Sequence, residues 1–311
     1  MPMYSILTHS ISKNYKGFQA LKNVNLAVKP GEIYGFIGLN GAGKTTMMRM
    51  LLNMIEPSEG HALILGQEVR QVSPLFWNNV GYLIETPHSY PNLTVAENLD
   101  LYARLRLIPS SVRAQRIKDL MDQLALTPYK NRLVKELSLG NNQKIGLIKA
   151  LIHRPKILLL DEPTNGLDPE GLTHVRQLLI HLAKDEGVTI LISSHILNEM
   201  EKMFTAIGIL HHGQLLRQES RAEYLKNAHH RLLITFSSVE EATKAKNIYA
   251  QKHIDWSASE TVYQLRLTAL EDLAAKQQLL ISNGILPTEW HEEVENMEEY
   301  FLSVLRKAGK K

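Results

Sequence analysis

The chain has 311 residues, which is long enough for one large domain with a small one, or for two domains. Apolar residues make up 44% and charged residues 22%, so disorder is not the default expectation, and the net charge of +3 argues weakly against a binder of nucleic acid or another polyanion. Because the sequence contains no cysteine, disulfides and thiolate metal sites are excluded.

The sequence shows no segment that would enter or cross a membrane. The first ten residues, MPMYSILTHS, lack a basic stretch followed by a long apolar one, so we expect no secretory signal. The longest aliphatic runs, such as KILLLD at 156–161, have the length of a strand and fall short of the roughly 20 apolar residues that span a bilayer. We therefore expect any membrane role to come through a partner.

The first half of the chain alternates strand-like and helical stretches. Residues 1–40 contain β-branched and apolar runs separated by turns, and the helical pattern KTTMMRMLLNMI follows. Two strand-like runs come next, HALILG and NVGYLIE, and then two helical stretches, LTVAENLDLYARLRL and SSVRAQRIKDLMDQLAL.

Helices and aliphatic strands alternate regularly from residue 140. The expected strands are KILLLD, GVTILISS and AIGILHHG, and amphipathic helices separate them. This alternation is typical of a parallel sheet covered on both faces, so we predict an α/β domain over residues 1–218. Past residue 219 the pattern changes to a separate α+β domain, 219–311, whose last expected helix is HEEVENMEEYFLSVLRK at 291–307.

A glycine-rich motif lies between the strand-like run EIYGFI and the first helical stretch. Residues 38–45, GLNGAGKT, fit the pattern G-x-x-x-x-G-K-[ST] of phosphate-binding loops. Such a loop turns backbone N–H groups inward around phosphate oxygens, and the positive end of the following helix faces the anion. Lys44 could then reach the β- and γ-phosphates, and the Thr45 hydroxyl could ligate Mg²⁺. A chance match in a glycine-containing turn is the alternative, and the strand–loop–helix setting argues against it.

A second candidate site follows the strand at 156–161. Asp161 lies at the carboxyl end of this strand, where an open α/β sheet presents its ligand crevice, and it could hold Mg²⁺ directly or through water. Glu162 could accept a proton from an attacking water. An acidic pair that caps the next helix is the alternative for these two residues. His195 follows another expected strand and could hydrogen-bond a γ-phosphate, or it could be a structural cap.

The order of the motifs is more specific than any one of them. The series GLNGAGKTT, LSLGNNQK, ILLLDEPTNGLD and SSH resembles the ATPase subunit of an ATP-binding cassette (ABC) transporter, over roughly residues 1–218. The resemblance implies a P-loop NTPase cassette with a RecA-like core, an antiparallel β subdomain and a helical signature subdomain at about 86–154. It also implies two subunits packed head to tail, with each ATP between the phosphate loop of one subunit and the LSLG signature of the other.

The resemblance implies roles for individual residues. Lys44, Glu162 and His195 would act in catalysis, with Glu162 as the general base. The metal site would comprise Thr45, Glu85 and Asp161. The residues expected to contact ATP are Tyr15 on the adenine, the loop residues Asn40, Gly41, Gly43, Lys44, Thr45 and Thr46, and the signature residues Ser138 and Gly140 in trans. Asp168 is expected at the subunit interface or as a helix cap, and Tyr15 could instead be an ordinary aromatic at a strand end.

Three features depart from the family pattern. In the signature, Leu139 replaces a glycine and Asn141 replaces a glutamine, whereas Ser138 and Gly140, which approach the phosphate, are kept. Glu85 stands where the family has a glutamine. Because a carboxylate would repel the γ-phosphate in a dry site, we hypothesise that Glu85 turns toward the site only when Mg²⁺ is present. The third departure is the C-terminal domain, which resembles extensions of drug, bacitracin-type and lantibiotic-immunity exporters.

The resemblance also implies partners and a location. The chain would need a separate integral-membrane permease at the cytoplasmic face of the cell membrane, and it would work as a homodimer or heterodimer of ATPase subunits, without nucleic acid. ATP and Mg²⁺ are the expected cofactors, and export of a drug, peptide antibiotic or other amphiphile is the expected task. The main alternative is a non-transport ABC ATPase that acts on ribosomes or DNA. A regulatory cassette that scarcely hydrolyses ATP is a third possibility, against which Glu162 and His195 argue.

Overall fold

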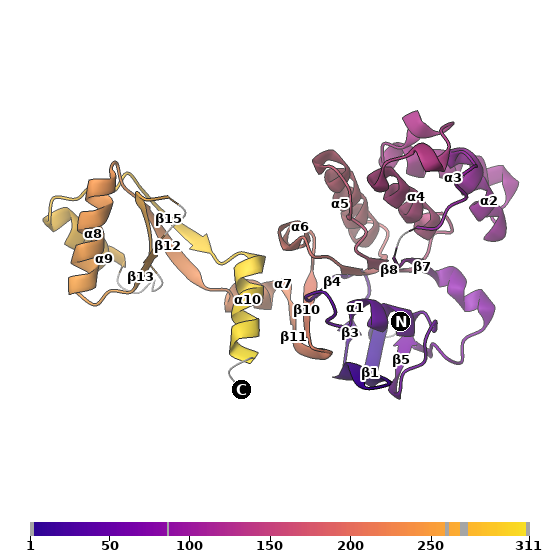
Figure 1. Cartoon of the computed structure of the whole chain (residues 1–311), viewed down its shortest axis with the longest axis horizontal. Helices are drawn as coiled ribbons and strands as arrows, with labels where there is room; N and C mark the ends of the chain where they lie inside the picture. The colour runs from indigo at the N-terminus through magenta and orange to yellow at the C-terminus, as the bar shows by residue number, and fades with distance from the viewer. Residues whose placement is uncertain (1–2, 86, 259–260, 268–272, 309–311) are drawn as a thin grey trace. The chain divides into compact units, whose positions relative to one another are not determined.

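The chain folds into two units. The structure, a computed structural model, describes residues 3–85, 87–258, 261–267 and 273–308. The first unit runs to Arg221 and the second begins at Ala222 (Figure 1). The expected boundary after residue 218 falls inside strand β11 (Gln214–Ser220), because this strand pairs with its neighbour through its last residue. The expected limits at residues 1, 86 and 311 lie outside the described residues.

A mostly parallel sheet forms the centre of the first unit. Among the described residues it has six strands in the order β11-β10-β4-β9-β8-β7, and the pairing of β10 with β11 is antiparallel. The strands besides β11 are β4 (Ile33–Ile37), β7 (Val80–Leu83), β8 (Ile157–Asp161), β9 (Thr189–Ser193) and β10 (Ala206–His211). Every residue of β4, β8 and β9 is buried, as is typical of aliphatic strands in a sheet covered on both faces. The α/β class expected from the sequence is confirmed.

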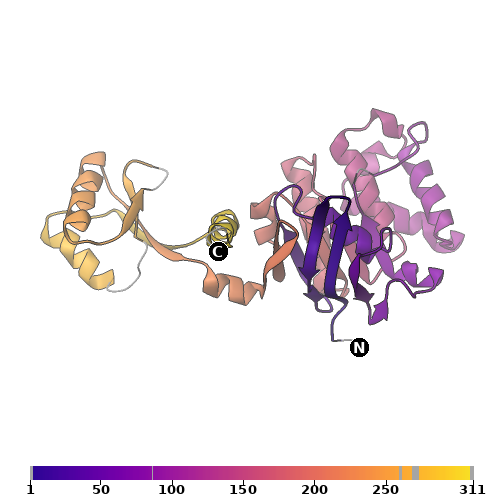
Figure 2. The ribbon, with the colours of Figure 1, turned by 60° about the horizontal axis from the view of Figure 1, so that its bottom comes forward.

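The first unit also contains a second, antiparallel sheet, which lies on one side of it (Figure 2). Its strands are β1 (Ile6–Tyr15), β2 (Phe18–Val24), β3 (Ala27–Val28), β5 (Glu59–Ile64) and β6 (Gln67–Glu68). Helix α1 (Lys44–Leu51) lies between the two sheets, because it contacts β2 and β5 of this sheet and β8 of the central one. Its buried apolar side chains, Met47, Met48, Met50 and Leu51, join those of both sheets in one apolar core.

The helical part of the first unit follows β7. It comprises α2 (Val95–Leu105), α3 (Ser110–Gln123), α4 (Leu139–Leu151) and the short 3-10 helices η2 (Thr127–Tyr129) and η3 (Val134–Glu136). A capping box starts α2: the Thr94 hydroxyl accepts the Glu97 N–H, and the Glu97 carboxylate accepts the Thr94 N–H. Helix α4, which begins at the signature, packs on β7 of the central sheet.

Three further helical elements complete the first unit. They are η1 (Pro74–Asn79), α5 (Pro169–Lys184) and α6 (Leu197–Glu201). Helix α5 packs on β4 and β9, where its buried residues include Val175 and Leu179. In the part of the chain that the structure describes, no helix has the length and apolar character needed to cross a membrane.

The second unit is a small α+β fold that α7 (Arg221–Asn227) leads into. Its strands are β12 (His230–Thr235), β13 (Trp256–Ala258), β14 (Gln264–Leu267) and β15 (Glu289–Val294), and its other helices are α8 (Val239–Gln251), α9 (Leu273–Ser282) and α10 (Met297–Ala308). The strands pair antiparallel in the order β13-β14-β12-β15. Helices α8 and α9 share one apolar core with this sheet, which gives the β-α-β-β-α-β arrangement of ferredoxin-like domains.

The prediction of a helix over residues 291–307 is wrong for the residues before Met297. Residues up to Val294 pair with β12, and the helix begins only at Met297. The stretch HEEV has few strong strand formers, so its conformation comes from pairing with a distant strand rather than from local preference.

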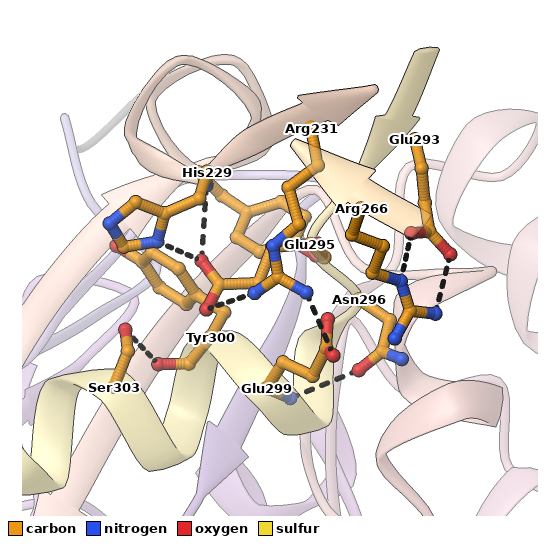
Figure 3. Close-up of polar contacts among 10 residues, drawn as sticks. His229, Arg231, Arg266, Glu293, Glu295, Asn296, Glu299, Tyr300 and Ser303 are labelled. Carbon is orange, nitrogen blue, oxygen red and sulfur yellow. Dashed lines mark hydrogen bonds and ion pairs between the residues drawn. The ribbon is translucent and has the colours of Figure 1, made fainter. Parts of the chain in front are cut away.

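A buried carboxylate joins β12 to the start of α10 (Figure 3). Glu295 is 3% exposed, and one of its oxygens accepts the backbone N–H of His229 at 3.0 Å and lies 2.6 Å from Nδ1 of the same residue. Arg231 lies 3.8 Å from the other oxygen and also pairs with Glu299 of α10 at 3.0 Å. A buried carboxylate costs free energy unless hydrogen-bond donors or charged partners surround it. Through Arg231 this cluster also connects β12 to Glu299 in the first turn of α10.

We expect Glu295→Ala to destabilise the second unit by about 2–3 kcal/mol, because it removes the buried acceptor of the His229 backbone N–H and the carboxylate beside the His229 ring. Glu299→Ala is the matched control: this carboxylate is 35% exposed, and its loss should cost at most about 1 kcal/mol. Hydrogen exchange of the β12 and β15 amides in the full chain measures both effects. Equal protection in the two variants would show that Glu295 does not hold the unit together.

Candidate nucleotide-binding site

The phosphate loop joins β4 to α1, and its glycines determine its shape. Gly41 and Gly43 have φ angles of 77° and 110°, in the left-handed region that favours glycine. A Cβ on Gly43 would lie 2.7 Å from the carbonyl oxygen of Ala20, and a Cβ on Gly38 would lie 2.5 Å from that of Leu210. The loop can lie this close to the neighbouring strands only because these positions carry no side chain.

Lys44 crosses the inside of the loop. Its Nζ donates hydrogen bonds to the carbonyl oxygens of Gly38 at 2.6 Å and Leu39 at 3.3 Å. The pKa of this ammonium lies below its usual value because the group is buried. The nearby carboxylates of Glu162 and Asp161 offset only part of this lowering. A cavity of about 290 Å³ opens beside the ammonium. The residues around this cavity are Phe18, Ala20, the loop residues 40–46, Asp161 and Glu162. An anion here would meet both the ammonium and the positive end of α1.

Two oxygen groups suited to a magnesium ion meet at this cavity. The Thr45 hydroxyl donates to Oδ2 of Asp161 at 2.6 Å, although the two residues are 116 positions apart in the sequence. Ser193, at the end of β9, donates to the other oxygen of the same carboxylate. Hydroxyl and carboxylate oxygens beside a phosphate site are ligands that Mg²⁺ prefers, so the residues present fit this ion.

Glu162 and His195 contact each other at the edge of the cavity. Oε2 of Glu162 lies 2.6 Å from Nδ1 of His195 and accepts the His195 backbone N–H at 3.1 Å. The Glu162 backbone has a φ of 50°, and its N–H donates to the hydroxyl of Ser193 at 3.0 Å. The carboxylate is therefore oriented by a histidine and lies beside the phosphate loop. A general base would need both features.

The signature residues line a different cavity, of about 470 Å³. Among the described residues, Ser138, Gly140, Asn141 and Asp168 contribute to its wall, and the phosphate loop does not. Ser138 caps α4 by accepting the Asn141 N–H at 3.2 Å, and Asp168 caps α5 by accepting the Gly171 N–H at 2.9 Å. Of the two roles that the sequence left open for Asp168, the helix cap is present in the structure.

Tyr15 and Phe18 pair across the turn between β1 and β2. Phe18 is 61% exposed and lines the phosphate-loop cavity. Tyr15 is also described by the structure, but it is not one of the residues that line this cavity. The ammonium of Lys13 lies 5.1 Å from the centre of the Tyr15 ring. The sequence reasoning missed Phe18, and the available signal was a second aromatic residue in the same turn.

Glu85 lines a third cavity, of about 260 Å³, together with Leu139, Gln143, Asn165 and the two acids Asp161 and Glu162. These two acids also belong to the phosphate-loop cavity, so the two cavities meet at them. The Glu85 carboxylate forms an ion pair with Arg49 of α1. The sequence reasoning missed Arg49, because a basic residue in the last turn of a helix is common.

Comparison with known proteins identifies the family. Residues 21–165 match the ABC transporter family. The bacitracin transport ATP-binding protein BcrA of Enterococcus faecalis is 33% identical over 307 residues, which cover 98% of each chain. The lantibiotic transport ATP-binding protein SrtF of Streptococcus pyogenes is 36% identical over 210 residues, or 68% of this chain and 88% of that protein.

A solved structure agrees with these relatives. The ATP-binding cassette MJ0796, described as a dimer in a post-hydrolysis state bound to ADP and Pi, is similar with a TM-score of 0.64 and 27% identity, over 69% of this chain and 98% of that one. The chain belongs to the ABC transporter family, as an ATP-binding subunit. It is an ATPase of a transporter, as the motif order predicted, and the comparisons give no support to the non-transport alternative.

We expect Phe18→Ala to weaken ATP binding about tenfold, because a base stacked on an aromatic ring gains about 1–3 kcal/mol. Phe18→Tyr should keep the affinity, and binding of inorganic tripolyphosphate, which has no base, should not change. Calorimetric titration measures these affinities, with Tyr15→Ala as the comparison. A loss with Tyr15→Ala and none with Phe18→Ala would place the base on Tyr15 alone.

Proposed function

We propose that this chain binds MgATP on its phosphate loop and hydrolyses it with Glu162 as the general base. The observation that carries the proposal is that Lys44, the Thr45–Asp161 pair and Glu162 line one cavity, while His195 contacts the Glu162 carboxylate. The unit that ends at Arg221 would supply all of these groups, and the unit that follows would be an accessory domain.

Hydrolysis requires a water molecule in line with the γ-phosphate, a base for its proton, and positive charge around the transition state. Lys44 and the backbone N–H groups of residues 40–46 supply positive charge. Glu162 accepts the proton of the water, and His195 holds the Glu162 carboxylate in place. A magnesium ion bound by Thr45 and Asp161 would neutralise phosphate charge, and Glu85 would face the same ion from the adjoining cavity.

We further propose that a second ATPase subunit completes the site. Ser138 and Gly140 line a cavity apart from the phosphate loop of their own chain, which is the arrangement expected when they serve the nucleotide of another subunit. Asp168 borders the same cavity and would then lie at the interface while it caps α5. In a head-to-tail dimer each subunit would give its phosphate loop to one ATP and its signature to the other.

A mixing experiment tests the contribution in trans. In a Glu162→Gln background, which slows hydrolysis, ATP should convert the chain from monomer to dimer. Adding either Lys44→Ala or Ser138→Arg to this background should abolish the conversion. A mixture of the two resulting double variants should still dimerise, because one composite site then combines an intact phosphate loop with an intact signature. Light scattering after size-exclusion chromatography measures the mass of each species. If the mixture stays monomeric while Glu162→Gln alone dimerises, the signature does not act in trans.

For the transport task, we propose that the dimer drives a separate membrane permease from the cytoplasmic face and that its cargo is a peptide antibiotic or a similar amphiphile. Support comes from the bacitracin transport protein BcrA, because the match covers 98% of each chain and therefore extends into the second unit. The lantibiotic transport protein SrtF, which matches 68% of this chain, points to the same class of cargo.

Cells that carry the Lys44→Ala chain should be inhibited by bacitracin or by a lantibiotic at a severalfold lower concentration than cells with the unaltered chain, because export would lack ATP hydrolysis. Purification of the unaltered chain from membranes in mild detergent should also recover a protein with several membrane spans. Unchanged sensitivity, together with a chain that sediments with ribosomes, would contradict the transport proposal.

A further inference from the structure

The ion pair between Glu85 and Arg49 joins two segments of the nucleotide site. Arg49 lies in the last turn of α1, the helix that begins at the phosphate loop, and its guanidinium donates to Oε1 of Glu85. Glu85 comes just after β7 and has a φ of 62°, a left-handed conformation that costs a non-glycine residue about 1 kcal/mol. Such a conformation persists where the surrounding structure holds it, and the ion pair connects the Glu85 side chain to α1.

The site is rich in negative charge before a nucleotide enters. Glu85, Asp161 and Glu162 line one cavity, and Asp161 and Glu162 also line the phosphate-loop cavity. ATP without a metal ion brings about four more negative charges, which three unpaired carboxylates would repel. Asp161 has Thr45 and Ser193 as hydrogen-bond donors, and Glu162 has His195. Glu85 has Arg49.

We propose that Arg49 is a positioning residue for Glu85: it neutralises the third carboxylate of the site and holds one of its oxygens, so that ATP can bind before Mg²⁺ arrives. A carboxylate has two oxygens, and the second remains available to a metal ion while the first is held. Among the described residues, the contacts of Glu85 include no other cation. This inference rests on the proposed function, because it concerns the same nucleotide site.

The competing explanation is an ordinary surface ion pair, which contributes about 0–1 kcal/mol to stability and nothing to binding. The chain contains a matched example. Arg70 pairs with Glu56 at 3.1 Å, and Arg70 is 39% exposed, as against 38% for Arg49. Neither Arg70 nor Glu56 lines the phosphate-loop cavity or the cavity of Glu85. The carboxylates differ more, because Glu85 is 56% exposed and Glu56 is 75% exposed. Of the four residues, Glu85 is the one that lines a cavity of the site, so an effect found with Arg49 and absent with Arg70 points to the contact with Glu85.

The test is a double-mutant cycle on ATP affinity, measured with a fluorescent ATP analogue and the full chain in EDTA. Arg49→Gln should weaken binding about fivefold, because the Glu85 charge becomes uncompensated. Arg49→Lys should stay close to the unaltered chain, and the control Arg70→Gln should match it. In a Glu85→Gln background, Arg49→Gln should have no effect. Saturating Mg²⁺ should reduce the loss caused by Arg49→Gln, because the ion supplies the missing positive charge.

Two results would overturn the inference. If Arg49→Gln weakens binding equally with and without Glu85→Gln, Arg49 acts on the nucleotide or on the fold rather than through Glu85. If Arg49→Gln leaves affinity unchanged, as Arg70→Gln should, the pair is only a surface contact. An unaltered chain that binds no ATP would instead contradict the proposed nucleotide site, so the two failures are distinguishable.

Discussion

The hydrogen bond between Thr45 and Asp161 joins the two halves of the nucleotide site. Thr45 belongs to the first turn of α1, and Asp161 ends β8 on the neighbouring part of the central sheet. Parallel strands bring their carboxyl ends to one edge, so the phosphate loop after β4, Asp161 after β8 and Ser193 at the end of β9 meet there. Lys44 precedes Thr45 and Glu162 follows Asp161, and this one junction therefore sets the position of the charged groups that would contact ATP.

The second constraint on the site is that each of its acidic residues needs a partner within the chain. Each of the three carboxylates at the site already has a partner within the chain: Thr45 for Asp161, His195 for Glu162 and Arg49 for Glu85. A site prepared in this way can accept a highly charged nucleotide without reorganising its own charges, which is the basis of electrostatic preorganisation. Under the proposed role of Arg49, the glutamate at position 85 would be compatible with ATP binding for the same reason.

The sequence predicted the groups that short motifs specify. The phosphate loop and the Asp161–Glu162 pair could be located because each follows an aliphatic strand directly, and a strand end in a parallel sheet has a defined place. The predicted family and fold class are confirmed. Phe18 was missed although the turn between β1 and β2 offered a second aromatic residue besides Tyr15. Arg49 could not be located, because it meets Glu85, 36 positions away, only in the folded chain. Strand β15 was missed because only its pairing with β12 makes it a strand.

The most direct test of the account is a structure of the Glu162→Gln chain with ATP and Mg²⁺. We expect a head-to-tail dimer in which Thr45 and Asp161 hold the magnesium ion, directly or through water, and Ser138 of the partner subunit lies within hydrogen-bond distance of the γ-phosphate. A monomer with ATP on the phosphate loop, or a dimer that leaves the signature cavity facing solvent, would contradict the composite site.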